Sequence, residues 1–263
     1  MKTITITNQK GGLGKTCIST NISRFLSEDF NKKVLFVDFD VQANASETLK
    51  DFNSNITCYD LISRDLTEQE INSLAMATEN TNLVLIKASN SLANSDSFDK
   101  NLCYKFFNLN MAKLKDKFDF MVIDTPPTLG NTLTLAFLFS EYLMIPLELD
   151  SFALMGLQKL LATYQNIKKI NTKLQLLGIV INKFYTQRKR QQELLEQINE
   201  KTGGNGLIFN SKIHPSVAIQ DSLSLSCSLR QLRKKKGSTD NRAINEFYAL
   251  TLEVIQKINH DKQ

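Results

Sequence analysis

Glycines and lysines gather near the start of the chain in the segment Lys10–Thr16, which reads KGGLGKT. Glycines let a loop curl until several backbone N–H groups point at one anion. The N-terminus of a following helix adds to the positive electrostatic field that these groups create. The residues before the loop, Thr3–Thr7, are typical of a strand, and Cys17–Ser27 are typical of a helix. A plain glycine-rich turn with chance lysines would not require this order, so we predict a phosphate site.

The loop is a variant of the pattern GxxxxGK[ST], because Gln9 stands where the first glycine would be and an extra lysine, Lys10, opens the segment. In P-loop enzymes the lysine at the position of Lys15 reaches the β- and γ-phosphates, and the hydroxyl that follows, here Thr16, ligates Mg²⁺. We therefore predict Mg²⁺ and ATP as ligands; for Lys10 alone, a solvated surface charge is the alternative. The predicted ATP contacts in this loop are Lys10, Gly11, Gly12, Leu13, Gly14, Lys15, Thr16 and Cys17.

Three acids end two other apolar runs. Asp38 and Asp40 lie in FVDFDVQAN, and the two-residue period of a strand places both on one side. If that strand neighbours the one before the loop, one carboxylate can orient an attacking water and the other can support the metal shell. Asp124 ends FMVID, the usual form of a Walker B strand. The alternative for each acid is the N-cap of a following helix.

The elements that must position these residues alternate along the chain. Short apolar runs are separated by longer helix-like segments, and several runs are apolar almost throughout, as strands covered on both faces are. This predicts an α/β fold with a doubly wound, mostly parallel sheet, whose ligands bind at the carboxyl ends of the strands. The predicted strands are Lys2–Asn8, Val34–Asp40, Leu83–Ala88, Phe120–Asp124, Tyr142–Leu149, Leu174–Asn182 and Leu207–Ile213.

The length of 263 residues suits one such domain, and we predict a single P-loop ATPase domain over residues 1–263. The weakly patterned segment Asp51–Thr81 is expected to form a helical insertion. Residues 241–259 carry an apolar stripe at helical spacing and are expected to form a C-terminal docking helix.

Composition excludes several other classes. The four cysteines form no CxxC pair and there are only two histidines, which excludes a structural zinc site or a disulfide framework and fits a reducing cytosol. The most apolar stretch, Leu133–Leu149, is too short and too polar to span a bilayer. We expect a soluble, cytoplasmic protein whose net charge of +5 permits an anionic partner without requiring one.

Four segments in order, KGGLGKT, VLFVDFDVQAN, FMVIDTPPTLG and LELDSFALMGLQKLL, resemble the motifs of ParA-type partition ATPases, the Soj-like group of the deviant Walker family. The resemblance runs from residue 3 to about residue 240. KGGxGKT alone is shared with Min-system, nitrogenase-reductase and flagellar-placement relatives, whereas the TPP and SFALMGLQKL segments favour the partition branch.

The resemblance implies ATP-dependent sandwich dimers in which Lys10 crosses to the partner's phosphates. It also implies that Asp40 activates water and that Asp124 binds Mg²⁺ through water. Asn182 is similar in position to an adenine-contacting residue, and the loop containing Pro215 is similar to the other wall of the adenine pocket. The predicted catalytic residues are thus Lys10, Lys15 and Asp40, and the predicted metal group is Thr16, Asp38 and Asp124.

The chain departs from the family pattern at three places. Val41 replaces a proline, Ile213-His214-Pro215 replaces Ile-Pro-Arg, and Asp150-Ser151 replaces Glu-Tyr. None of these changes touches the predicted phosphate chemistry, whereas the second falls on the predicted adenine wall. The chain starts at the P-loop strand without a helix-turn-helix segment, so operator binding is not expected.

Two basic runs lie in the C-terminal third, and no acid occurs between Asp221 and Asp240, so the second run is expected to be unneutralised. Such a field tracks DNA phosphates without reading sequence, and the resembling family binds nonspecific DNA through basic residues in this third. A solvated basic face is the alternative. The predicted DNA contacts are Arg188, Arg190, Arg230, Arg233, Lys234, Lys235 and Lys236.

Together these features predict a nucleoid-associated ATPase for plasmid or chromosome partition, which dimerises on ATP, hydrolyses it slowly and responds to a ParB-like centromere-binding protein. The alternative is a membrane- or pole-associated positioning ATPase of the Min or flagellar type, whose C-terminal stripe would insert into lipid. Glu246 and Glu253 beside that stripe disfavour anionic lipid, and no stable membrane association is expected. A metabolic relative would need a cysteine pair bridging the dimer, and no such spacing occurs.

Overall fold

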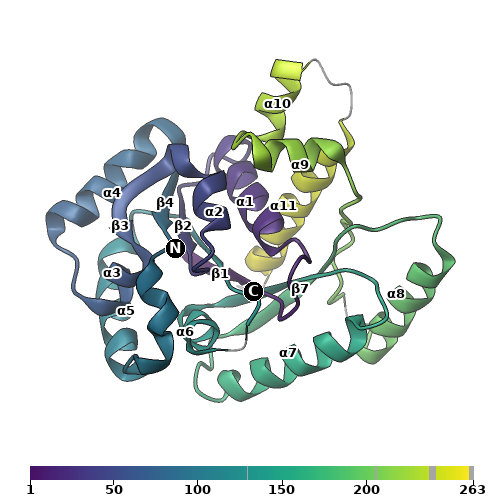
Figure 1. The fold of residues 1–263 in the computed structure, drawn as a ribbon, viewed down its shortest axis with the longest axis horizontal. Coiled ribbons are helices and arrows are strands. Elements are labelled where there is room, and N and C mark those ends of the chain that lie inside the picture. The colour runs from purple at the N-terminus through teal and green to yellow at the C-terminus, as the bar shows by residue number, and fades with distance from the viewer. Residues whose placement is uncertain (129, 205, 237–240, 261–263) are drawn as a thin grey trace.

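The computed structural model describes residues 1–128, 130–204, 206–236 and 241–260. One sheet of seven strands, parallel throughout, runs through the centre in the order β3-β4-β2-β5-β1-β6-β7 (Figure 1). The predicted α/β class with a doubly wound parallel sheet is therefore confirmed. The strands are β1 (Lys2–Ile6), β2 (Val34–Asp38), β3 (Asn53–Thr57), β4 (Leu83–Lys87), β5 (Phe120–Asp124), β6 (Tyr142–Leu147) and β7 (Gln175–Ile181).

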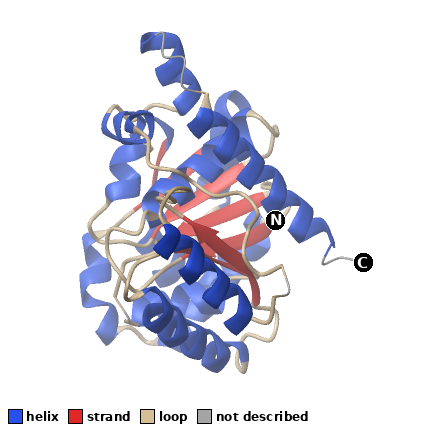
Figure 2. Cartoon of the chain, turned by 90° about the vertical axis from the view of Figure 1, so that its right-hand side faces the viewer, coloured by secondary structure: helices blue, strands red, loops and turns tan. Residues whose placement is uncertain are grey.

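Helices cover the sheet on both faces, as Figure 2 shows from the side. One layer contains α1 (Lys15–Glu28), α2 (Asn44–Thr48), α9 (Val217–Ser224), α10 (Leu229–Lys236) and α11 (Arg242–His260). The other contains α3 (Cys58–Ser63), α4 (Glu68–Thr81), α5 (Lys100–Leu114), α6 (Asn131–Phe139), α7 (Ala153–Lys168) and α8 (Lys189–Lys201). Two 3₁₀ helices, Lys50–Phe52 and Asn90–Ser97, complete the connections.

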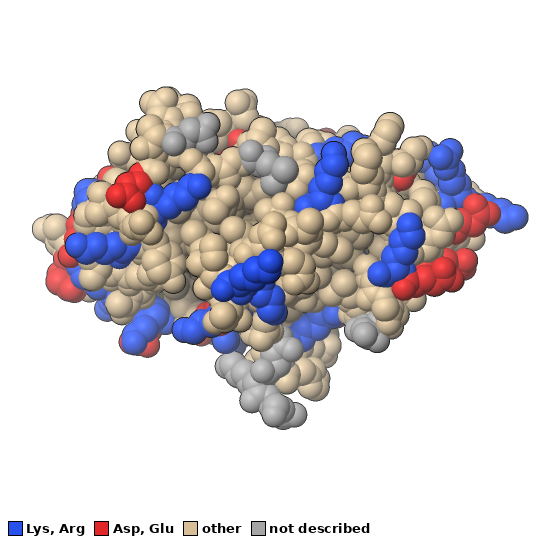
Figure 3. Space-filling model, turned by 90° about the horizontal axis from the view of Figure 1, so that it is seen from below, with Lys and Arg blue, Asp and Glu red and all other residues tan. Residues whose placement is uncertain are grey.

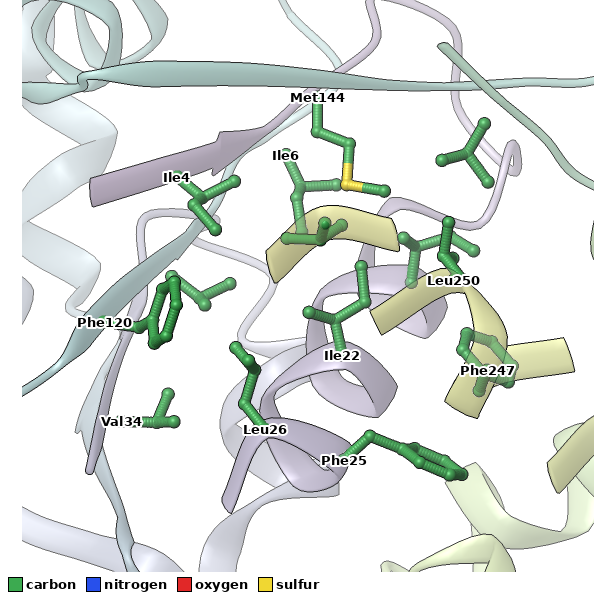
Figure 4. Close-up of a cluster of buried hydrophobic side chains, with 14 of the residues drawn as sticks. Ile4, Ile6, Ile22, Phe25, Leu26, Val34, Phe120, Met144, Phe247 and Leu250 are labelled. Atoms are coloured by element: carbon green, nitrogen blue, oxygen red, sulfur yellow. The ribbon is translucent and has the colours of Figure 1, made fainter. Parts of the chain in front are cut away.

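Alternation along the strands separates two cores. In β2, Val34 and Phe36 pack toward α1 and α11, whereas Leu35 and Val37 pack toward the opposite layer. Because both faces of the central strands are covered, both sets of side chains are apolar, which is why these strands read as continuous apolar runs. Figure 4 shows the first core, where side chains of α1 and α11 meet those of the sheet.

The segment expected as a helical insertion is only partly helical. Residues 53–57 form β3, which pairs in parallel with β4 at the edge of the sheet before α3 and α4 begin. The strand reads NSNIT, and only Ile56 in it is buried, so neither an alternating nor a continuous apolar pattern marks it. An edge strand needs few apolar side chains, because much of its surface faces solvent.

The predicted strand Leu207–Ile213 is wrong. Residues 207–209 follow β7 through hydrogen bonds to Ile179, and Ile213 returns to donate its N–H to the carbonyl of Ile181 (3.0 Å), but residues 210–212 leave the sheet between these points. Glu253 of α11 accepts the N–H groups of residues 210 and 211 at 2.8 and 3.1 Å. A side chain thus replaces the strand partner, and the apolar residues of the segment reflect burial rather than strand pairing.

The C-terminal helix α11 lies along α1. The rings of Phe25 and Phe247 stack with centroids 6.2 Å apart, and Phe30 stacks on Tyr248 at 5.1 Å. Most of the stripe that would insert into lipid in the Min-type alternative is buried here within the protein, with Phe247 and Val254 fully covered, whereas Tyr248 is exposed. Within the described parts of the chain, no helix has the length and apolar character needed to cross a bilayer.

Candidate nucleotide site

The predicted phosphate loop and acids converge at the carboxyl edge of the sheet. β5 lies between β1 and β2, and Asp124 is in register with Ile6 on one side and Asp38 on the other. The strand that ends in Asp38 is therefore not a direct neighbour of the loop strand, because β5 intervenes. Even so, parallel strands of similar length bring all three ends to one edge.

Two glycines give the loop its curl. Gly12 and Gly14 have φ angles of +77° and +84°, a left-handed backbone that side chains disfavour. A Cβ on Gly14 would also collide with the side-chain amide of Asn182, which donates to the carbonyl of Leu13 at 2.9 Å. Asn182, predicted to contact adenine, thus lies directly against the loop.

Lys15 begins α1 and is only 7% exposed. Its Nζ atom lies 3.4 Å from the carbonyl of Lys10 within the loop itself. Burial lowers the pKa of the Lys15 ammonium, while the charges of Asp124 and Asp40 act in the opposite direction. A buried cation at the start of a helix, under a curled glycine loop, is suited to hold a polyphosphate.

Asp124 and Thr16 fit a magnesium ion. The hydroxyl of Thr16 donates to Oδ2 of Asp124 at 2.7 Å, and Oδ1 of Asp124 is buried without a hydrogen-bond partner. Burial, followed by the nearby charge of Asp38, raises the pKa of Asp124 to about 8, so this carboxyl gains from a cation. In the described residues no three His, Cys, Asp or Glu side chains form a ready-made cage. Magnesium bound with a nucleotide needs only one or two protein ligands.

Asp38 and Asp40 differ in how they are held. Asp38 is fully buried, and its oxygens accept from the N–H of Asp40 (3.0 Å) and from both the N–H and hydroxyl of Ser46 (each 2.8 Å). Asp40 accepts one hydrogen bond, from the N–H of Gln42 at 3.0 Å, and lines the cleft. The geometry therefore gives Asp38 a place in fixing α2, while Asp40 faces the space beside the loop.

Lys10 is held by its own chain. Its ammonium forms an ion pair with Asp150, which follows β6, and lies 6.0 Å from the ring centre of Phe152. Lys183 reaches the same loop, with its ammonium 3.0 Å from the carbonyl of Gly12 and 2.6 Å from Glu148. Sequence reasoning missed both pairs, since their members lie far apart in the chain and no local pattern joins them.

A cleft of about 710 Å³ opens beside the loop. Loop residues and Asp40 form one side, and α2 with the turn after α9 forms the other. Pro215, predicted as an adenine wall, is exposed and lies two residues after Ile213. Because Ile213 donates to Ile181 and accepts from Phe184, the segment carrying Pro215 runs beside Asn182.

Comparisons with known proteins match this arrangement. A sequence profile described as an AAA domain matches residues 1–176. The chain is 34% identical over 229 residues to the chromosome-partitioning ATPase Soj of Treponema pallidum, covering 85% of this chain and 87% of that protein. It is 32% identical over 268 residues to the virulence plasmid ParA family protein pGP5-D of Chlamydia psittaci, covering 100% and 98%. The chain belongs to the ParA family of partition ATPases.

A solved structure shares the fold of this ParA-family ATPase. It is a putative plasmid partition protein from Borrelia burgdorferi bound to AMPPNP, with a TM-score of 0.73 and 22% identity. The match covers 98% of this chain and 99% of that one. The likeness therefore includes α9–α11, which the profile match to residues 1–176 does not reach.

Some residues of the two basic runs are already paired within the protein and others are exposed. Contrary to the predicted unneutralised field, Arg230 pairs with Asp29, with Nε 3.0 Å from Oδ2, and its guanidinium lies 5.6 Å from the ring centre of Phe25. Asp29 is 201 residues away in sequence, so the absence of nearby acids could not reveal it. Arg233 and Lys234 are exposed on α10, while the side chains of Lys235 and Lys236 lie outside the described residues.

The other run begins α8 beside the nucleotide edge. The guanidinium of Arg188 stacks on Tyr185 at 3.7 Å from the ring centre, and Arg190 donates to Oγ of Ser151 at 2.9 Å. Residues 151–192 contain no Asp or Glu. On the face seen from below in Figure 3, basic side chains are spread along the molecule, while most acidic atoms lie toward its ends.

Proposed function

We propose that this protein is an ATP-driven DNA-segregation ATPase that binds Mg·ATP through Lys10–Thr16 and Asp124. One observation carries the proposal: Thr16 donates to one oxygen of Asp124, the other oxygen of that carboxyl is buried without a partner, and both residues lie beside the glycine loop that covers Lys15. Isothermal calorimetry with ATP and Mg²⁺, followed by phosphate release, tests it directly. An absence of Mg²⁺-dependent ATP binding would refute it.

In this proposal, the chain contributes positioning and charge to the hydrolysis. Lys15 and the loop N–H groups stabilise charge that develops on the phosphates, and Mg²⁺, when bound, adds Lewis-acid stabilisation. Asp40 orients the attacking water, because it faces the cleft and has carboxylate lone pairs to spare. Asp38 supports the site by holding Ser46 at the start of α2.

We further propose that ATP brings two copies together and that Lys10 then reaches the partner's phosphates. The side chain of Lys10 is 48% exposed, so it can exchange one anionic partner for another at small cost. Asp150 therefore competes with the partner's nucleotide for this lysine. The competition is weak, since a half-exposed ion pair contributes only about 0–1 kcal/mol.

Removal of the competing carboxylate is expected to favour the dimer. Asp150→Asn, made in an Asp40→Ala background that prevents hydrolysis, should tighten ATP-dependent dimerisation by up to about fivefold for each Lys10 that crosses to the partner, the range of an exposed ion pair. Analytical ultracentrifugation with ATP measures this. A weaker dimer in Asp150→Asn would mean that Asp150 supports the ATP-bound state rather than competing with it.

We propose that the dimer binds DNA without regard to its sequence. Support comes from Arg233 and Lys234 on α10 and from the acid-free stretch that contains Arg188 and Arg190. Contacts of this kind hold phosphates and read no bases, so binding is indifferent to sequence and sensitive to salt. We also propose a ParB-like centromere-binding protein as the stimulating partner and a nucleoid-associated, cytoplasmic location.

The two basic runs can be separated by salt dependence. Arg233→Ala with Lys234→Ala, and Arg188→Ala with Arg190→Ala, should each flatten the slope of log affinity against log salt. On duplex DNA the slope falls by about 0.9 for each phosphate that the variant no longer neutralises. Arg230→Ala is the matched control: it removes the same charge from α10, but Asp29 already neutralises that charge, so the slope should stay unchanged. Filter binding with ATP across a salt series provides the measurement. An unchanged slope in both double variants would refute DNA binding through these runs.

A further inference from the structure

A third lysine reaches the phosphate loop from outside the loop's sequence motif. Lys183 follows β7 by two residues and Glu148 directly follows β6, so both lie just beyond the carboxyl ends of neighbouring strands. The ammonium of Lys183 lies 2.6 Å from Oε1 of Glu148 and donates to the carbonyl of Gly12 at 3.0 Å. The fold thus brings to the loop a cation that stands 171 residues away in the chain.

The surroundings of Lys183 fix where its ammonium lies. Oε1 of Glu148 is buried, so this carboxylate gains from a cation beside it. The backbone of Lys183 is left-handed, with a φ angle of +50°, a conformation that is costly for a lysine. The N–H of Asn182 donates to the carbonyl of Leu147 at 2.8 Å, which holds the start of this turn against β6. A strained turn and a buried carboxylate together direct the lysine to the loop.

Two consecutive peptide groups of the loop are held from the end of β7. Lys183 holds the carbonyl of Gly12, and the side-chain amide of Asn182 donates to the carbonyl of Leu13 at 2.9 Å. In a trans peptide, the N–H of the following residue points opposite to the carbonyl. The N–H groups that follow, those of Leu13 and Gly14, must therefore point away from the end of β7.

That direction suits an anion site. The cleft of about 710 Å³ is lined by Gly12, Gly14 and the start of α1, whereas neither Asn182 nor Lys183 lines it. These two side chains therefore hold the loop from outside the cleft. A loop binds phosphate when successive N–H groups point at one anion, and its glycines leave it free to turn them elsewhere. Donors that keep the carbonyls turned outward reduce the ordering that binding must impose.

We propose that Lys183, anchored by Glu148, is a positioning residue of the phosphate site: by holding the carbonyl of Gly12, it orients the N–H groups of the loop before ATP binds. The inference rests on the proposed function, because it takes Lys10–Thr16 to bind the phosphates of ATP. It deepens that function by adding a residue outside the loop motif and by giving the ion pair between Glu148 and Lys183 a role.

Lys183→Met is expected to weaken ATP binding. The change keeps most of the aliphatic stem and removes the donor to Gly12. Because 49% of the Lys183 side chain is exposed, the loss should lie at the lower end for a charged hydrogen bond, about five- to tenfold in affinity. Lys183→Arg keeps a cation that can pair with Glu148 and donate to the loop, so it should restore most of the affinity.

Glu148→Met separates positioning from simple attraction. If Lys183 acted only through its charge, removal of the neighbouring carboxylate would leave the loop more positive and would tighten ATP binding. If Lys183 acts through its position, loss of the anchor frees the ammonium and ATP binding weakens. We expect the second result, a weakening of about two- to fivefold, the range of a partly exposed ion pair.

Lys2→Met is the matched control. Lys2 also forms an ion pair, with Glu141 at 2.7 Å, but it begins β1, whereas the phosphate loop follows the other end of that strand. Thermal melts should show similar losses of stability in Lys2→Met and Lys183→Met. Only Lys183→Met should lose ATP affinity.

Calorimetric titrations with ATP and Mg²⁺ on the wild-type chain and the four variants test the inference. Unchanged affinity in Lys183→Met, unchanged or tighter binding in Glu148→Met, or equal losses in Lys183→Met and Lys2→Met would overturn it. So would a Lys183→Arg variant that binds no better than Lys183→Met. Failure of the wild-type chain to bind ATP would instead refute the proposed function, so the two failures are distinguishable.

A second measurement covers the case in which Glu148→Met does not fold. The titrations of the wild-type chain and Lys183→Met are then repeated at about 1 M salt, where charges are screened beyond about 3 Å. A difference in affinity that persists supports positioning, because the hydrogen bond to Gly12 is short. A difference that disappears would show that Lys183 acts only through its charge, and would overturn the inference.

Discussion

Lys15→Ala is expected to weaken ATP binding by at least about thirtyfold. Lys15 is 7% exposed and lies under the loop, so its charge meets the phosphates with little screening. Truncating one member of a buried charge pair costs about 2–5 kcal/mol, which corresponds to a factor of about thirty to several thousand. Burial lowers the pKa of this ammonium in the free protein, and the negative charge of a bound phosphate would offset that desolvation.

Lys10→Ala serves as the control for this prediction. Both lysines belong to the same loop, but Lys10 points to Asp150 and is half exposed. We expect Lys10→Ala to bind ATP within a few-fold of the wild-type chain and to hydrolyse it poorly. Calorimetry on the two variants separates the roles. Near-wild-type affinity in Lys15→Ala would remove this residue from the phosphate site.

Asp40→Ala is expected to retain ATP binding and lose hydrolysis by a factor of about 10² to 10⁴, the usual contribution of a positioned base. Asp40 faces the cleft, whereas the predicted phosphate contacts come from the loop, so the water loses its partner and the nucleotide does not. With ATP, the variant should accumulate as a dimer. Phosphate release and sizing chromatography with ATP measure the two effects.

Glu47→Ala provides a matched control for Asp40→Ala, because Glu47 is another acid lining the same cleft. It should hydrolyse ATP at close to the wild-type rate. If Asp40→Ala is folded and ATP-bound but stays monomeric, the ATP-driven dimer is wrong. If it hydrolyses ATP normally, another group orients the water.

The central strands could be predicted because both of their faces are covered. β2 and β5 each consist of four apolar residues followed by an acid. A short run that is apolar throughout is typical of a parallel strand covered by helices on both faces. The loop Lys10–Thr16 was equally readable, since its glycines and lysines act through local backbone geometry. β3 was not, because an edge strand with one buried residue has no apolar pattern to read.

The other features that the sequence did not predict depend on contacts between residues far apart in the chain. The ion pair of Arg230 with Asp29 and that of Lys10 with Asp150 join positions 201 and 140 residues apart. The detour of residues 210–212 depends on Glu253 in the last helix. Composition near each residue indicates charge or burial, but it does not indicate which partner the fold will supply.

The packing of α11 on α1 sets the order in which the protein can mature during synthesis. The phosphate-loop helix α1 leaves the ribosome long before its cover α11, whose Phe247 packs against Phe25. Until then, the apolar side of α1 has no final partner and is open to chaperones and to aggregation. A nascent chain should therefore acquire nucleotide binding only after α11 has been synthesised, even though the loop itself is translated much earlier.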